Sequence, residues 1–453
     1  MKKVRLGAGS AYWGDMLEPA VEVAKHGNVD YMGFDHLAEL TMSILQRMKD
    51  KNPKAGYIAD IVPWMRQLLP IAKANGVKLI TNAGGANPEA AADAVIEVCK
   101  SLGITGMKIG VVTGDDIGDR LQELRDQGLK FRNLDTGEED IDRIADRIVA
   151  AHAYIGAERI IDALAEGCDI VITGRCSDNA LFVAPLMYEF GWKFEDPYWD
   201  KVGAAITIGH VLECAECATG GLSNMWDQAP NMARIGFPIA EVDEEGNALV
   251  TKVEGSGGLV NEWTIKEQLT YEIKDPTRYM MPDGVADFTR LKLEDLGNDQ
   301  VRLSNMGGDA RPETLKVQIG YRDGFIGEGQ ILLPWPDAYA KAKKAEEIVR
   351  ERFEIVGLEA QELRFDYMGV NTLHGELSPE PSCDLNEVGL RIVAKTKTIE
   401  EADKVRREGT HLWTLGGIGA AFGVPFKPRP VIGLWPTLVP RSDVETKLTV
   451  REV

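Results

Sequence analysis

The residues best suited to chemistry lie in the segment Asp169–Leu181, DIVITGRCSDNAL, where an apolar run ends at a glycine and polar side chains follow. The run has the β-branched density of a strand buried on both faces, and Gly174 allows a sharp turn. Arg175 then offers a planar guanidinium that can bind a carboxylate or phosphate. Asp178 either orients that guanidinium or caps the helix expected over residues 179–190. Ligands in open α/β sheets bind at the carboxyl ends of strands, so this segment is predicted to form part of a site.

Three other predicted strands end in loops of similar polar character, which read GAGS, TNAGGANP and TGDD. Asn87 is predicted to cap the helix that follows it, and the backbone N–H groups of Gly84 and Gly85 can bind an anion at that helix start. Such loops also serve as plain turns. Because the carboxyl ends of parallel strands meet at one edge of a sheet, we expect a shared crevice. The predicted ligand-binding residues are Arg175, Asn82, Gly84, Gly85, Asn87 and Thr173.

Two carboxylates and a histidine follow the strand expected over residues 29–34. Asp35, His36 and Glu39 are predicted to lie at the strand end and on the first turn of the next helix. Carboxylates four residues apart on one helical face can hold a divalent cation or act as acid and base. Residues of this kind also cap and solubilise helix starts. Asp35 and Glu39 are therefore candidate metal ligands.

Another polar pair lies on a long apolar helix. His210 and Glu213 are three residues apart and share a face, so they can act as a general acid/base pair, or the glutamate can hold a buried histidine. Cys214 and Cys217 have redox or metal spacing, but a zinc ribbon needs a second such pair and the sequence has none. Their Ala-rich setting is more typical of packing. A thiol enzyme that uses Cys176 or Cys214 is a further alternative.

The elements around these candidates predict a two-part chain. Five apolar runs alternate with helical patterns over residues 1–225, which favours an α/β domain with a parallel Rossmann-like sheet and helices on both faces. We expect this domain to carry the site. Residues 226–453 are predicted to form an α+β domain with a mixed sheet and antiparallel hairpins that turn at EEGN, LGND and YRDGF. This domain would contribute to the crevice or to oligomerisation. The glycine- and proline-rich segment 416–430 either lines the crevice or packs loosely.

The composition excludes several classes of partner. The chain has 453 residues, 44% hydrophobic and 27% charged, which allows two or three domains with ordinary cores. A net charge of −20 argues against nucleic acid and anionic membrane surfaces, which are bound through clustered Lys and Arg. No apolar run is long enough to span a bilayer, and the six scattered cysteines fit a reducing compartment. A cytoplasmic protein is expected.

Motifs in one order cover most of the chain. They include DYMGFDHLAELT, ITNAGGANPEAAA, VVTGDD, TGRCSDNAL, GHVLECAECATGG, VADFTRLKLEDLG and VIGLWPTLVPRSDV. In these motifs the chain resembles the acyclic terpene utilisation (AtuA) family. The resemblance implies a role in the catabolism of branched acyl compounds, often as CoA thioesters, and a small related subunit that binds in trans. Two places differ from the family pattern. Cys217 stands where the family usually has another residue, which argues against a CxxC function, and the run LGGIGAAFG replaces a run of several glycines, which argues against phosphate binding there.

The strand-end loops favour an enzyme with lyase or hydratase chemistry. They are rich in Asn, Asp, Arg, Thr and backbone N–H donors, and the sequence has no nucleophile elbow. We predict a homo-oligomeric catabolic enzyme, favoured to be a hydro-lyase, that acts on a small branched carboxylate or acyl-CoA. The alternative is a non-catalytic acyl-CoA-binding or scaffold subunit of a multi-enzyme assembly. A divalent metal or a CoA thioester would accompany this chemistry, and Arg175 would bind the carboxylate. The candidates for proton transfer are Asp115, Asp178, His210 and Glu213.

Overall fold

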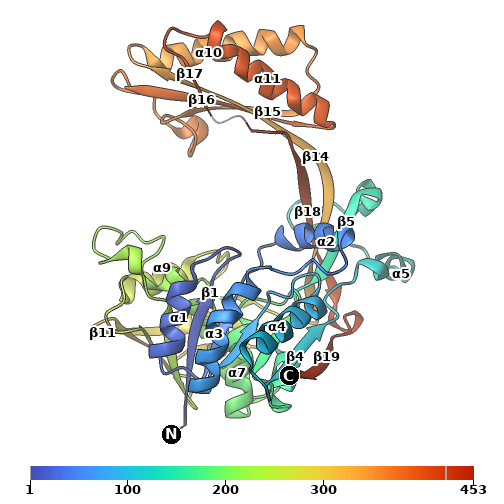
Figure 1. Ribbon diagram of the computed structural model, residues 1–453, viewed down its shortest axis with the longest axis vertical. Coiled ribbons are helices and arrows are strands. Elements are labelled where there is room, and N and C mark those ends of the chain that lie inside the picture. The colour runs from blue at the N-terminus through green and yellow to red at the C-terminus, as the bar shows by residue number, and fades with distance from the viewer. Residues whose placement is uncertain (1, 424–425) are drawn as a thin grey trace. The chain divides into compact units, whose positions relative to one another are not determined.

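The structure is a computed structural model that describes residues 2–423 and 426–453. The chain forms two compact units, which we call unit 1 (Met1–Gly320 with Leu434–Val453) and unit 2 (Tyr321–Gly433), drawn in Figure 1. The junctions between them do not coincide with the boundary predicted near residue 225, because strands from both sides of that position belong to one sheet. Of the segment 416–430, residues 424–425 lie outside the described residues.

Unit 1 is built on a ten-stranded mixed sheet with the order β11-β12-β8-β7-β1-β2-β3-β6-β4-β19. Its centre is parallel, since β1 pairs with β2, β2 with β3, β3 with β6 and β6 with β4. These strands are mostly buried, as expected for apolar runs covered on both faces. They are the five strands predicted from the sequence. Their bounds are β1 (Lys3–Ser10), β2 (Tyr31–Phe34), β3 (Lys78–Thr81), β4 (Lys108–Thr113) and β6 (Ile170–Thr173).

Antiparallel strands extend the sheet on both sides. β7 (Pro238–Asp243) pairs with β1 and is followed outward by β8 (Ala248–Lys252), β12 (Gln300–Ser304) and β11 (Lys292–Gly297). The hairpins predicted at EEGN and LGND are thereby confirmed. At the opposite edge β19 (Lys447–Glu452) pairs with β4. A small separate sheet has the order β13-β10-β9, with bounds β9 (Tyr279–Met280), β10 (Val285–Asp287) and β13 (Gly307–Asp309).

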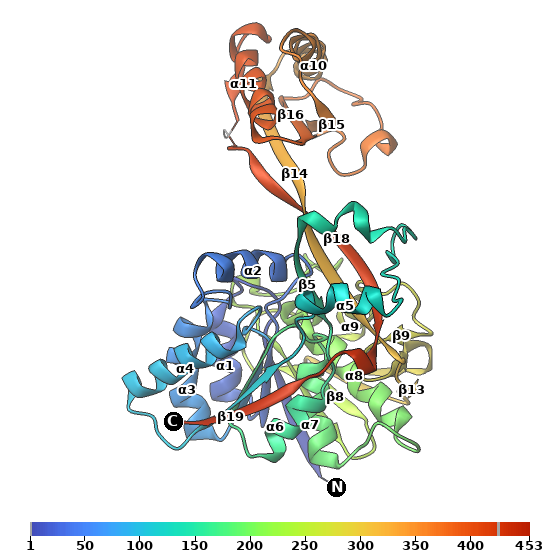
Figure 2. The same cartoon turned by 90° about the vertical axis from the view of Figure 1, so that its right-hand side faces the viewer.

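Helices cover both faces of the parallel strands. α1, α3 and α4 lie on one face, and α6, α7 and α8 lie on the other (Figures 1 and 2). The approach of α7 to β2 is close, because a Cβ on Gly33 would lie 2.6 Å from the ring of Phe182. Within the described residues no helix is both long and apolar enough to cross a membrane. The helix bounds are α1 (Leu17–His26), α2 (Thr41–Lys51), α3 (Ile61–Asn75), α4 (Pro88–Leu102), α5 (Leu121–Asp126), α6 (Glu158–Ala165), α7 (Ala180–Phe190), α8 (Trp199–Glu213) and α9 (Glu262–Thr270).

Two local predictions are wrong for identifiable reasons. The hairpin predicted at YRDGF is absent, because the single strand β14 (Thr314–Pro334) runs through these residues and its second half pairs with β16 (Glu387–Thr396). Asp35, His36 and Glu39 were predicted to lie at the strand end and on the first turn of the next helix, but that helix, α2, begins only at Thr41. In addition, β5 (Ile148–Ala153), which pairs with β14, has no counterpart in the prediction.

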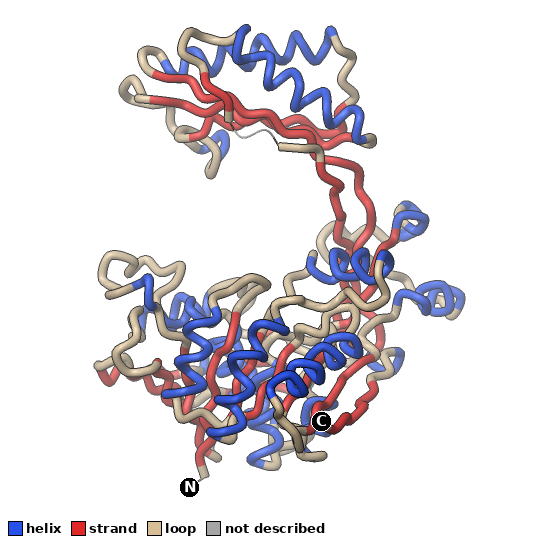
Figure 3. The backbone as a smooth tube through the Cα atoms, in the orientation of Figure 1, coloured by secondary structure: helices blue, strands red, loops and turns tan. Residues whose placement is uncertain are grey.

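Unit 2 is a small sheet with helices on one face (Figure 3). Besides β16, β14 pairs with β17 (Ala421–Phe422) and β18 (Arg429–Pro440), and β16 pairs with β15 (Ala360–Met368). The helices α10 (Ala338–Ile355) and α11 (Ile399–Leu415) enclose an apolar core with alternate residues of the strands. The intervening position Arg391 instead bonds to Glu328 at 2.6 Å and Asp366 at 2.9 Å. Both β14 and β18 contain residues of each unit.

Candidate functional site

A cavity of about 520 Å³ lies in unit 1 at the carboxyl ends of β1, β2 and β6, with its wall completed by residues that follow α8 and α9. This is the edge at which parallel sheets bind ligands, and the volume is typical of small-molecule sites. Five of the predicted site residues line it, namely Asp35, Glu39, Arg175, Asp178 and Glu213. Other lining residues include Tyr12, Glu216, Leu222, Tyr271 and Glu272.

Arg175 is a buried cation in the cavity wall, with 1% of its surface exposed. Its Nε donates to the backbone oxygen of Cys176 at 2.7 Å, and its Nη1 donates to that of Leu37 at 2.6 Å. Its Nη2 forms an ion pair with Asp178, and the ring of Tyr154 lies 4.4 Å from its Cζ. Three of the five guanidinium N–H groups therefore already have partners in the protein. The contacts join the loop after β6 to the loop after β2.

Of the two roles predicted for Asp178, the structure shows the one that orients Arg175. The helix α7 begins at Ala180, its N-cap residue is Asn179, and no side chain caps it. Asp15 lies before α1 and likewise does not cap it, since its carboxylate accepts hydrogen bonds from the backbone N–H groups of Ala11 at 2.8 Å and Met16 at 2.6 Å. In both cases the acidic side chain stabilises the strand-end loop instead of the helix.

Asp35 and Asp178 lie close to the same guanidinium, and their pKa values depart from the usual range. Burial raises the pKa of Asp35 to about 6, against the opposing effects of the Arg175 charge and the Asn82 hydrogen bond. Burial also raises the pKa of Asp178, and the Asp35 charge adds to this while Arg175 opposes it. Both carboxyl groups therefore keep a proton to a higher pH than an ordinary aspartate does.

The carboxylate of Asp35 is held from one side only. Its Oδ1 accepts hydrogen bonds from Asn82 Nδ2 at 2.5 Å and from the backbone N–H of Leu37 at 3.1 Å. Asn82 Oδ1 accepts the backbone N–H of His36 at 2.8 Å, which fixes the loop after β2 in a non-helical form. Oδ2 of Asp35 has no hydrogen-bond partner among the described residues. Asn82, predicted to bind ligand, thus orients Asp35.

The predicted pair of His210 and Glu213 is confirmed as a contact. His210 Nδ1 and Glu213 Oε1 are 2.7 Å apart, and His210 Nε2 lies 2.9 Å from the backbone oxygen of Gln268. The imidazole also stacks near Phe288, at a ring distance of 5.5 Å. Because both ring nitrogens are engaged and His210 is 1% exposed, Glu213 is the member of the pair that faces the cavity.

The cavity rim carries further carboxyl groups. Glu39 accepts a hydrogen bond from Lys316 at 3.3 Å. Burial, followed by the charge of Asp15, raises the pKa of Glu216 to about 7, and its Oε2 is buried without a partner. Glu216 was not among the residues predicted from the sequence, because the cysteines are the more distinctive residue type in the surrounding ECAEC. Tyr271 and Glu272 follow α9, and no motif distinguishes them in the sequence.

Asp115 lies behind the cavity wall. Its Oδ2 accepts the backbone N–H of Arg175 at 2.9 Å and lies 2.9 Å from Nδ1 of His152, a buried residue of β5. A Cβ on Gly174 would collide with this carboxylate, at 2.2 Å from Oδ1, so the turn after β6 needs glycine. Asp115 is therefore placed to position Arg175, and its predicted part in proton transfer stays a prediction.

The side chain of Asn87, in the loop after β3, forms its hydrogen bonds with the protein backbone. Asn87 caps α4 as predicted, since its Oδ1 accepts the N–H of Ala90, and its Nδ2 donates to Pro53 O at 2.9 Å and Ala55 O at 2.7 Å. A Cβ on Gly84 would lie 2.4 Å from Thr173 O. The structure does not bring Gly84, Gly85, Asn87 or Thr173 into the cavity lining. Thr173 bonds through its hydroxyl to Gly174 O.

The model of the acyclic terpene utilisation family protein AtuA matches residues 4–450, nearly the whole chain. The protein belongs to this family. Membership implies a part in acyclic terpene utilisation. Comparison with the curated proteins and with the solved structures gave no match.

In this AtuA family member the cysteines near the cavity have raised thiol pKa values. Burial raises the pKa of Cys176 and of Cys217 to about 12 each, and it raises the pKa of Cys214. Thiols of this kind are poor nucleophiles at neutral pH. No arrangement of three or more His, Cys, Asp or Glu side chains suited to a metal ion occurs within residues 2–423 and 426–453. The predicted metal ligands Asp35 and Glu39 both line the cavity.

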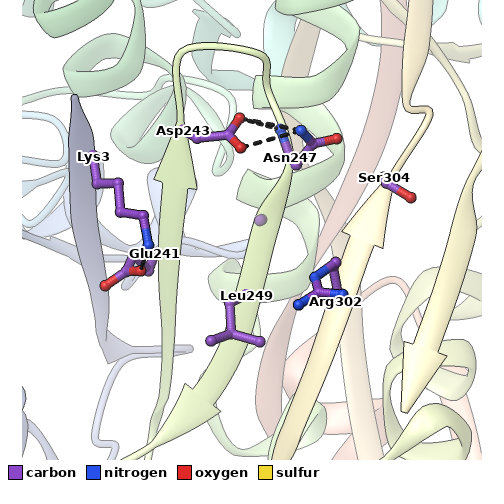
Figure 4. Close-up of a pocket in the computed structure, with 8 residues that line it drawn as sticks. Lys3, Glu241, Asp243, Asn247, Leu249, Arg302 and Ser304 are labelled. Atoms are coloured by element: carbon purple, nitrogen blue, oxygen red, sulfur yellow. Dashed lines mark hydrogen bonds and ion pairs between the residues drawn. The ribbon is translucent and has the colours of Figure 1, made fainter. Parts of the chain in front are cut away.

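A second hollow of the AtuA protein, about 380 Å³, lies on the antiparallel side of the sheet (Figure 4). Its residues come from β1, β7, β8 and β12 and include Lys3, Glu241 and Arg302. Lys3 pairs with Glu241 at 2.5 Å, and Arg302 pairs with Glu294 at 2.6 Å. At the hairpin end the carboxylate of Asp243 accepts hydrogen bonds from the side-chain amide of Asn247. The charged side chains of this hollow thus already have hydrogen-bond or ion-pair partners in the protein.

Proposed function

We propose that this AtuA family protein is a catabolic enzyme of acyclic terpene utilisation with hydro-lyase chemistry. Its substrate would be a small branched acyl compound, as a CoA thioester or a carboxylate. The observation that carries the proposal is the group of Asp35, Asp178 and Arg175 in a cavity at the strand ends, where burial raises the pKa of both carboxyl groups, that of Asp35 to about 6. Carboxyl groups with such pKa values are suited to general acid–base catalysis. The parallel strands would act as a Rossmann-like platform for the ligand.

The two carboxyl groups would divide the proton transfers between them. Asp35, whose Oδ2 is free, removes a proton from the carbon next to the acyl carbonyl. The C–O bond to the hydroxyl on the adjacent carbon breaks, and a proton from Asp178 converts the leaving group to water. The positive charge of Arg175 would allow the two carboxyl groups to lie close together, with Asp35 ionised as the base and Asp178 protonated as the acid. The products are an enoyl compound and water, and hydration is the reverse of these steps.

Glu213 offers a second route for the proton. It faces the cavity, and His210 holds it at 2.7 Å. A substrate whose reacting carbon lies nearer α8 would use Glu213 as the base. The variants Asp35→Asn and Glu213→Gln distinguish the two routes, because the larger loss of rate identifies the base.

The test is turnover of branched 3-hydroxyacyl-CoA and 2-enoyl-CoA compounds, followed by gain or loss of the enoyl absorbance. Asp35→Asn and Asp178→Asn should each lower the rate at least about 10²-fold. Asp119→Asn makes the same change at an exposed position outside the cavity and should keep the wild-type rate. Binding of these thioesters without turnover, with any small related subunit supplied, would instead support a non-catalytic scaffold subunit.

A further inference from the structure

The charge of the cavity wall is strongly one-sided. Its described lining includes six carboxyl groups and a single guanidinium, that of Arg175. The carboxyl groups are those of Asp35, Glu39, Asp178, Glu213, Glu216 and Glu272. Lys316 pairs with Glu39 at 3.3 Å and Arg175 pairs with Asp178, but the other four carboxyl groups have no ion pair with Lys or Arg among the described residues. A ligand that carries its own negative charge into this space would therefore meet like charges on several sides.

The guanidinium does not offset that charge for a ligand. Arg175 is 1% exposed, its Nε and Nη1 donate to backbone oxygens, and its Nη2 is paired with Asp178. A ligand carboxylate could form a bidentate contact only if it displaced Asp178. The guanidinium of Arg175 is therefore the counter-ion of Asp178 and not a binding group for the ligand.

One acceptor in the wall lacks a partner and is suited to a neutral donor. Oδ2 of Asp35 is unbonded, while Oδ1 is fixed by Asn82 and Leu37, so the direction of the free oxygen is set. Asp35 is 6% exposed and lines the cavity. A hydroxyl group on the ligand would supply the missing donor. Apolar side chains in the same wall, Leu37 and Leu222, can contact a branched hydrocarbon.

We propose that this cavity selects an uncharged, hydroxyl-bearing branched acyl group, held as an ester or thioester, and excludes the corresponding free carboxylic acid. Of the thioester and the carboxylate that the proposed function allows, only the thioester remains. The only part of the proposed function that is assumed here is that the ligand binds in this cavity. It applies to the part of the ligand inside the cavity, so the charged phosphates of a CoA thioester would stay outside it.

The experiment is isothermal titration of the full-length protein at pH 8 with 3-hydroxy-3-methylbutanoate and with its methyl ester. The ester should bind at least tenfold more tightly than the acid, because the two share the hydroxyl group and the branched carbon chain and the ester lacks the negative charge. Equal or tighter binding of the acid would overturn the proposal, and so would failure of both to bind.

Charge variants make the result specific to this wall. Glu216→Gln and Glu272→Gln each remove one like charge and should raise the affinity for the acid, relative to that for the ester, at least threefold. Glu244→Gln makes the same change in the exposed turn after β7 and should leave the ratio as in the wild type. An unchanged ratio in both cavity variants would contradict the electrostatic cause. Because binding is measured without turnover, preferential binding of the ester by an inactive protein would support this inference and reject the enzymatic proposal.

Discussion

Two pairs of strand-end loops in unit 1 have similar composition and different uses. The loops after β2 and β6 line the cavity, whereas the loops after β3 and β4 do not. In the first pair, Asp35 Oδ2 is left without a partner and Arg175 lies at the wall. In the second pair, Asn87 and Asp115 are bonded to backbone groups or to a neighbouring histidine. A polar loop is therefore a candidate site only where some of its hydrogen-bonding groups have no partner within the protein.

Removal of the buried cation should have the largest effect on this comparison. Arg175→Met leaves the carboxyl groups of Asp35 and Asp178 without their counter-charge and breaks the bonds to Leu37 and Cys176. We expect the free energy of unfolding to fall by about 3–5 kcal/mol at pH 7.5, measured by urea denaturation. Arg302→Met removes an exposed ion pair with Glu294 and should cost no more than about 1 kcal/mol. Similar costs for the two variants would mean that Arg175 does not join the loops.

The titration of Asp35 should give the next largest effect. Its pKa of about 6 in the folded protein exceeds the value near 4 of an unfolded aspartate, so the folded state binds the proton more tightly. The resulting stability is complete below pH 4 and is lost as the pH rises through 6, a change of about 3 kcal/mol. Asp35→Asn should lack this decline when the unfolding free energies of the two proteins are compared between pH 4 and 7.5. Parallel pH profiles would contradict the assigned pKa.

A smaller loss is expected from the loop after β3. Asn87→Ala removes the cap of α4 and should reduce the free energy of unfolding by about 1 kcal/mol. Because Asn87 does not line the cavity, ligand affinity should stay within a factor of two of the wild type. A large loss of ligand affinity with unchanged stability would mean that the loop after β3 binds the ligand, which is the role predicted for Asn87 from the sequence.

The smallest effect is expected in the second hollow. Asp243 Oδ1 accepts the backbone N–H groups of Glu245 at 3.0 Å and Asn247 at 2.9 Å, which closes an exposed hairpin. Asp243→Ala should lower the free energy of unfolding by about 0.5–1 kcal/mol, with no change in turnover. A loss of turnover would show that the antiparallel flank, and not only the strand ends, takes part in function.

The sequence predicted elements well where local pattern determines them. The strand expected over residues 29–34 and the helix expected over residues 179–190 correspond to β2 and α7, because turn or capping residues mark where each apolar segment begins or ends. The order of strands was not predictable in this way. β6 follows β4 in the chain and yet lies between β3 and β4, and the pairing of β14 with β16 replaced the hairpin expected at YRDGF.

The contacts of the candidate site are likewise of two kinds, those that local spacing predicts and those that depend on the packing of distant segments. Arg175 and Asp178 are three residues apart, and their contact follows from local spacing. The meeting of Arg175 with Leu37 and the approach of Glu272 depend on how distant segments pack, and no local pattern carries that information. The pKa of Asp35, raised to about 6, is also a product of burial in the folded protein, so the sequence left a metal ligand, an acid/base group and a helix cap as alternatives for this residue.

The interruption of unit 1 by unit 2 has a consequence for synthesis. Unit 2 is one continuous stretch of chain, so all of its strands leave the ribosome together and its sheet can close as soon as they have emerged. The sheet of unit 1 is complete only after the synthesis of β19, which pairs with β4 and follows all of unit 2 in the chain. Until then the backbone N–H and C=O groups along one side of β4 are open to other chains. A nascent or prematurely terminated chain is therefore most vulnerable to aggregation at that edge.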